Sequence, residues 1–159
     1  MEDIAQNNLA SFINPTINVL EEMTGVKSTP SEVMTHKSMF PSSEIAVVIG
    51  ISGELHGAYV ISAPKDVAYE MASKLMGSLD TSELERYEIA EAIAEFANIV
   101  AGNSMILMEQ SKININISPP TIVIGQGEDL RIGGSSEMLI TLLDSDIGEV
   151  AISLALMKA

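Results

Sequence analysis

The segment Glu91-Ala-Ile-Ala-Glu-Phe-Ala-Asn-Ile-Val-Ala-Gly-Asn103 lies within the longest run of helical periodicity in this 159-residue chain. The pattern predicts a helix that begins after a cap at residues 80–82 and ends near Gln110. At about 100° per residue, its apolar side chains fall on one narrow stripe. That stripe, which we expect to be buried, consists of Ile89, Ile93, Phe96 and Val100.

A set of polar side chains occupies the opposite face of the same predicted helix. Glu91, Glu95 and Asn98 stand at positions i, i+4 and i+7, so they project together away from the apolar stripe. Neighbours that are small or apolar lie on or near this side and leave room for another surface to approach: Leu84, Gly102 and Met105. We therefore take Glu95 and Asn98 as candidate functional residues, with Glu91, Gly102 and Met105 as candidate partner contacts.

An ordinary solvated helix face is the alternative, because exposed helix surfaces are often acidic. Three features count against it. Glu91 and Glu95 repel each other one turn apart, where a stabilising surface would pair Glu with Lys. Asn98 is a poor helix former, and Gly102 costs about 1 kcal/mol relative to Ala in a helix interior. Together these features indicate a face kept for recognition.

The rest of the chain predicts an α+β fold in a single domain spanning residues 1–159. Residues 4–23 read as a helix that is stopped by Gly25 and is either kinked or divided at Pro15. Residues 44–52 are rich in β-branched side chains and predict a buried strand that forms a hairpin with residues 58–62. A second helix should open with Pro64 at its first position and end near Gly77.

The strand candidates after the long helix are residues 113–117, 121–124, 137–143 and 150–156. The order of helix, strands, two helices and strands favours a mixed or antiparallel sheet with long helices packed on one face. Residues 150–156 form a strongly apolar strand, and such a strand at a sheet edge would need cover from its own chain or a second copy.

Composition narrows the possible functions. A formal net charge of −14 disfavours nucleic acid and anionic membranes as partners. The chain has no Cys, so it has neither a thiolate nucleophile nor a thiolate metal site. His36 and His56 stand outside any motif and are taken as structural or solvent-exposed. The glycines between residues 125 and 134 do not form a phosphate loop, and no Gly-x-Ser-x-Gly elbow supports a Ser-His-Asp triad.

The cellular location is predicted from the N-terminal residues and from the length of the apolar runs. The first residues are acidic (Glu2, Asp3) and lack the basic and apolar regions of a signal peptide. Apolar runs are far shorter than the roughly 20 residues of a membrane helix. We expect a cytoplasmic protein without membrane insertion.

The motif on the long helix resembles that of the CheC/CheX/FliY family of chemotaxis phosphatases. Glu91-x3-Glu95-x2-Asn98 matches the family's helix motif, and Pro120 stands 22 positions after Asn98, as the family pattern has it. Glu91 occupies a position where members often have Asp or Ser. The layout of an N-terminal helix, a hairpin, two helices and then strands is similar over most of the chain. Only one copy of the motif is present, as in the single-site, CheX-like members.

The resemblance implies a hydrolase that removes the aspartyl phosphate of a CheY-type response regulator in two-component signalling. It implies that Asn98 orients the attacking water and that Glu95 anchors the helix to a Lys of the regulator. Pro120 would be a structural part of the motif. The regulator would supply Mg²⁺, so no metal site or other cofactor is expected in this chain. The resemblance also implies a homodimer.

Two other functions stay open from sequence. The chain is alternatively a non-catalytic adaptor of the same fold that binds a response regulator without hydrolysing its phosphate. The second alternative is an unrelated acidic scaffold whose helix face, with Glu91 and Glu95, binds a protein or, weakly, a divalent cation.

Overall fold

The computed structural model describes residues 4–37, 39–40, 44–125, 130–131 and 137–159. Its helices are α1 (Ile4–Asn8), α2 (Ala10–Thr24), α3 (Lys65–Leu75) and α4 (Arg86–Gln110). Its strands are β1 (Thr29–Pro30), β2 (Met34–Lys37), β3 (Met39–Phe40), β4 (Ile45–Gly53), β5 (Leu55–Ala63), β6 (Ile115–Ile117), β7 (Thr121–Ile124), β8 (Leu130–Arg131), β9 (Glu137–Ser145) and β10 (Gly148–Lys158). The Gly-rich segment noted in the sequence falls largely outside the described residues.

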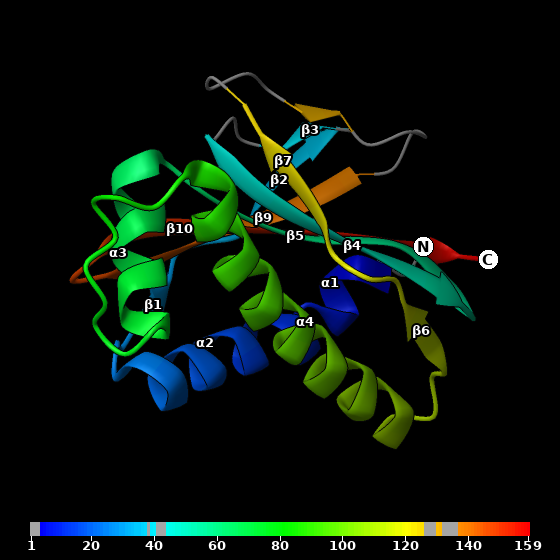
Figure 1. The fold of residues 1–159 in the computed structure, drawn as a ribbon. Helices are drawn as coiled ribbons and strands as arrows, with labels where there is room; N and C mark the ends of the chain where they lie inside the picture. The colour runs from blue at the N-terminus through cyan, green and yellow to red at the C-terminus, as the bar shows by residue number, and fades with distance from the viewer. Residues whose placement is uncertain (1–3, 38, 41–43, 126–129, 132–136) are drawn as a thin grey trace.

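The strands form one large antiparallel sheet in the order β1-β9-β10-β5-β4-β6. Strand β2 also pairs with β9, and β7 pairs with β4. The helices lie on one face of this sheet, and the small pair β3–β8 lies beyond the other face (Figure 1). The α+β prediction with helices on one face is confirmed, and the described strand pairs are all antiparallel.

The core between helices and sheet holds the largest buried side chains of the chain. Tyr59 on β5 and Phe12 on α2 are fully buried, with ring centroids 5.8 Å apart. The Tyr59 hydroxyl lies 2.9 Å from Thr16 Oγ1, and the Thr16 hydroxyl is also close enough to donate to the Phe12 carbonyl. Burial raises the pKa of the Tyr59 phenol well above its usual range. These contacts hold α2 against the middle of the sheet.

Two local predictions are corrected by the structure, and one alternative is decided. The first helix divides at Leu9, whose carbonyl accepts the Phe12 and Ile13 N–H groups, whereas Pro15 lies buried inside α2. Pro64 caps α3 from outside, because its extended backbone precedes the first helical residue. Of the two possible covers for the apolar strand β10, the structure shows its own chain, because β10 lies between β5 and β9.

The cap of α4 is also corrected. Residues 80–82 form a turn before the helix, in which the Ser82 N–H donates to Asp80 Oδ1 at 2.9 Å. This hydrogen bond holds the pKa of Asp80 below its usual range. The N-cap is Glu85, whose N–H donates to the Glu88 carboxylate at 3.2 Å in the manner of a capping box. Leu84 therefore belongs to the loop before α4 and not to the helix.

Candidate functional site

The long helix α4 separates apolar and polar residues as its sequence predicts. Ile89, Ile93, Phe96 and Val100 are all buried. Glu91, Glu95 and Asn98 are all exposed to solvent. The helix packs against α2 and α3 on the helix side and against β4, β6 and β7 of the sheet. A rigid support on five elements thus holds the polar face in a fixed orientation.

The start of α4 is tied to the sheet by one ion pair. Arg86 Nη2 lies 3.7 Å from Oε2 of Glu44, the residue directly before β4. Both side chains are partly exposed, at 42% and 33%, so the pair contributes little to stability. Packing of the buried stripe, and not this pair, fixes the position of Glu95 and Asn98.

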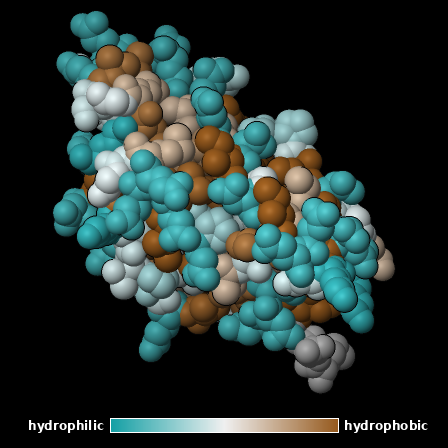
Figure 2. Space-filling view, turned by 90° about the horizontal axis from the view of Figure 1, so that it is seen from below, coloured by the Kyte–Doolittle hydropathy of each residue, from teal (hydrophilic) through white to brown (hydrophobic). Residues whose placement is uncertain are grey.

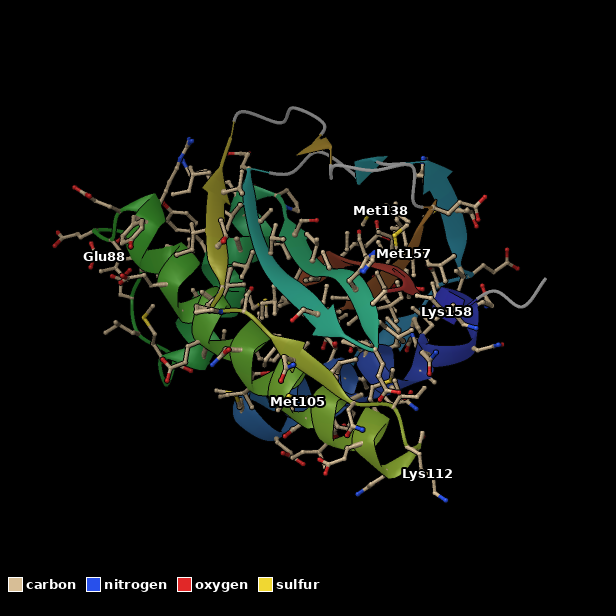
Figure 3. All side chains as sticks on the ribbon, turned by 90° about the vertical axis from the view of Figure 1, so that its right-hand side faces the viewer. Glu88, Met105, Lys112, Met138, Met157 and Lys158 are labelled. Carbon is tan, nitrogen blue, oxygen red and sulfur yellow. The ribbon has the colours of Figure 1, made fainter. Side chains whose placement is uncertain are left out.

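Two of the predicted contact residues are equally buried but have different surroundings. Gly102 is half-buried, and a Cβ built on it would have no neighbouring atom within 4 Å. Met105, labelled on α4 in Figure 3, is half-buried and packs against the hydrophobic core. Gly102 leaves open space beside Asn98, whereas part of the Met105 side chain is already engaged inside the protein.

Pro120 lies where the edge of the sheet is interrupted. Strand β6 pairs with the end of β4 and β7 pairs with its beginning, so the segment between them bulges away opposite Gly50. Ser118 fastens this bulge: its Oγ accepts the Gly50 N–H at 2.8 Å, and its own N–H donates to the Gly50 carbonyl at 2.9 Å. Pro120, directly before β7, suits such a place because it offers no N–H to a ladder. Since β6 and β7 both pack on α4, the bulge belongs to the support of the polar face.

A pocket beside Glu95 was not predicted from sequence. It has a volume of about 360 Å³ and is formed by the loop between α3 and α4 together with the first turns of α4. We call it the α3–α4 pocket; it is lined by Met76, Leu79, Leu84, Glu88, Glu91, Ala92 and Glu95. Three of these seven residues come from a loop without helical or strand periodicity, so no sequence pattern brings them together with α4. The prediction that Leu84 shares a side with Glu91 and Glu95 holds here, although Leu84 reaches that side from the loop.

The other candidate residues lie apart from this face. His36 on β2 and His56 on β5 are exposed and face Met138 and Met157 across their strand pairs. In the described part of the chain, no group of three or more His, Asp or Glu side chains is arranged to hold a metal ion. Nor does any described helix have the length and apolar content needed to cross a membrane.

Comparison with known proteins identifies the family. The model of the family described as "Chemotaxis phosphatase CheX" matches residues 45–143. A protein named CheY-P phosphatase CheX, from Thermotoga maritima, is 31% identical over 113 residues, which cover 71% of this chain and 67% of that protein. The chain belongs to the CheX family.

Solved structures show the same fold at low sequence identity. A CheC-like superfamily protein from Shewanella sp. PV-4 superposes with a TM-score of 0.85 at 18% identity, covering 98% of this chain and 99% of that one. The CheX–CheY–BeF3–Mg²⁺ complex of Borrelia burgdorferi contains a chain that matches with a TM-score of 0.78 at 22% identity, covering 95% and 98%. In this CheX family member, Glu95, Asn98 and Pro120 all fall within the matched segment.

Proposed function

We propose that this CheX family member removes the phosphoryl group from the aspartyl phosphate of a CheY-type response regulator. The observation that carries the proposal is the placement of Glu95 and Asn98, which are both exposed on one face of a helix whose opposite face is wholly buried. The name of the Thermotoga relative, a CheY-P phosphatase, supports the reaction. The Borrelia structure, a complex of CheX with CheY, supports the partner.

In this proposal the chemistry is hydrolysis of an acyl phosphate. A water oxygen forms a bond to phosphorus as the bond from phosphorus to the aspartyl oxygen breaks, and the electron pair of that bond stays on the aspartate carboxylate. The regulator supplies the Mg²⁺ and the Lys that offset charge on the phosphoryl oxygens. Asn98 enters the regulator's pocket, where its carboxamide oxygen and N–H group position the water in line with the leaving oxygen. This chain contributes geometry and needs no metal of its own.

Glu95 has the second role in the proposal. It stands one turn before Asn98 on the same face and is exposed, so its carboxylate is free to meet the Lys of the regulator in a charge-assisted hydrogen bond. That bond fixes the distance between α4 and the phosphoryl group. Glu91 is also exposed and, like Glu95, borders the α3–α4 pocket, but it stands one turn further from Asn98, so we assign it to docking and not to hydrolysis.

A decay assay on a phosphorylated regulator tests the proposal. With Mg²⁺ present, the wild-type protein is expected to accelerate phosphate loss. Asn98→Ala should reduce that acceleration about 100-fold or more, in the range seen when one positioned group is removed from an active site. Glu95→Ala should reduce it chiefly through weaker binding. Circular dichroism of each variant serves as the folding control.

The adaptor function makes a different prediction in the same assay. An adaptor binds the phosphorylated regulator but leaves its decay rate unchanged, and Asn98→Ala then alters nothing but affinity. Acceleration that survives both Asn98→Ala and Glu95→Ala would place the site elsewhere on the protein. Either result replaces the mechanism above.

We also propose that the protein acts in the cytoplasm as a homodimer, on the strength of its family. The long strand β10 gives no support for a dimer, since its own chain covers both of its edges. Sedimentation at micromolar concentration measures the oligomeric state, and a monomer there would remove the dimer without affecting the catalytic proposal.

A further inference from the structure

The α3–α4 pocket presents apolar surface next to the proposed catalytic face. Its apolar lining comes from Met76, Leu79, Leu84 and Ala92. Leu79 is 49% exposed, a large fraction for a leucine in a folded domain. Figure 2, which looks onto the helix layer from below, shows hydrophobic patches on this side of the molecule between hydrophilic side chains.

Hydrogen bonds hold Leu79 in this exposed position. Its N–H donates to the Ser73 carbonyl at 3.2 Å, and its carbonyl accepts the Ser73 hydroxyl at 2.7 Å. Gly77 and Ser78 both have left-handed backbone angles, with φ of 76° and 66°, which turn the chain sharply back onto the end of α3. The backbone of the exposed leucine is therefore held before any partner arrives, so little backbone entropy is lost when its side chain is covered.

Charge decides what chemistry the pocket accepts. Three carboxylates border it, those of Glu88, Glu91 and Glu95, and none of the described residues that line it is basic. Glu88 already accepts the Glu85 N–H at the helix cap, so Glu91 and Glu95 are the freer pair. An apolar floor with an anionic rim matches a side chain that has a methylene stem and a cationic end.

We propose that the α3–α4 pocket is a partner-specificity site that takes a Lys or Arg side chain of the response regulator, beyond the Lys that Glu95 meets. This inference rests on the proposed function, because it takes the regulator as the occupant. The stem packs on Leu79, Met76 and Leu84, and the charged end meets Glu91 at the rim. The site also offsets electrostatic repulsion between the two proteins. This protein has a net charge of −14 and approaches a regulator's acidic phosphorylation pocket, and a basic side chain beside that pocket provides local attraction.

Two kinds of variant test the pocket. Leu79→Ser removes the apolar contact, and Glu91→Lys reverses the charge of the rim. Each is expected to weaken binding of the phosphorylated regulator, seen as a rise in both Kd and KM, by about tenfold, the effect of losing one well-packed interface residue. For Leu79→Ser, which leaves the helix face of Glu95 and Asn98 intact, the kcat should stay within about twofold, in contrast to Asn98→Ala. Val33→Ser is the matched control, because Val33 is also exposed, at 38%, but lies between β1 and β2 at the other end of the sheet.

Charge exchange identifies the occupant. Each Lys and Arg around the regulator's phosphorylation site is changed to Glu, and binding to wild type and to Glu91→Lys is measured by calorimetry. One such regulator variant should bind wild type about tenfold more weakly and recover when paired with Glu91→Lys. If no pairing recovers affinity, or if Leu79→Ser binds as tightly as wild type, the pocket is not the docking site.

These results are separable from the proposed function. Binding without accelerated decay would end the phosphatase proposal, while the affinities of the variants would still decide the role of the pocket. Accelerated decay with an unchanged Kd for both variants would end the pocket proposal alone. A wild-type protein that neither binds nor dephosphorylates any regulator of its own organism would remove both.

Discussion

Replacing Gly102 by Ala should make the protein more stable, which is unusual for a change beside a functional face. Gly102 lies well inside α4, with no positive backbone angle, and a Cβ added there would meet no atom within 4 Å. Nothing in the fold opposes the methyl group, so the gain is the helix propensity difference of about 1 kcal/mol. For a domain of this size, that corresponds to a rise in Tm of about 2–4 °C.

Urea unfolding followed by circular dichroism measures the change, and Gly148→Ala is the control. Gly148 has a φ of 113°, and its added Cβ would lie 2.7 Å from Val67 Cγ2. The same substitution should therefore destabilise the protein at this position, by more than about 1 kcal/mol. If Gly102→Ala lowered the free energy of unfolding, the reasoning that this glycine is kept for recognition at the expense of stability would be refuted. In the decay assay the same variant should lose activity severalfold, because the methyl group stands one turn beyond Asn98.

Two further predictions concern the core and the loop before α4. Tyr59→Phe should cost about 1 kcal/mol in urea unfolding, because it removes the hydrogen bond to Thr16 within the core; a neutral result would show that this bond adds no net stability. NMR titration of Asp80 should give a pKa below that of an unstructured Asp, because its carboxylate accepts the Ser82 N–H. The lowered pKa of Asp80 then stabilises the folded state at pH values above the pKa of Asp80 in the unfolded chain, and this stabilisation is lost as the pH falls through the pKa in the folded protein. An ordinary pKa for Asp80 would mean that the turn is open in solution.

Local periodicity accounts for what sequence predicts correctly here. The buried stripe of α4 and the polar face of Glu91, Glu95 and Asn98 follow from the helical repeat, which needs no knowledge of distant residues. The hairpin of β4 and β5 follows from two apolar strands joined by a short turn. Gly25 ends α2 with a φ of 76°, as a glycine after a helix is expected to do.

The helix caps and the first helix show where local signals mislead. Asp80, Thr81 and Ser82 are all good capping residues, yet the turn they form stands before α4, and Glu85 is the cap. Pro15 is a signal for a division of the first helix, but it lies inside α2 with its ring buried, and the division falls at Leu9. At the cap, several residues offer the same local chemistry, and packing against the core selects among them.

By itself, then, the sequence determined which residues share a helix face and which strands are adjacent along the chain, because both depend on short-range repeats. Only the tertiary structure decided that β10 lies in the middle of the sheet, and that the bulge at Ser118 supports α4. It alone also placed Leu79 and Leu84 beside Glu91 and Glu95. Those arrangements depend on contacts between segments far apart in sequence and on a loop held by hydrogen bonds to Ser73. Neither kind of contact produces a periodic pattern in the sequence.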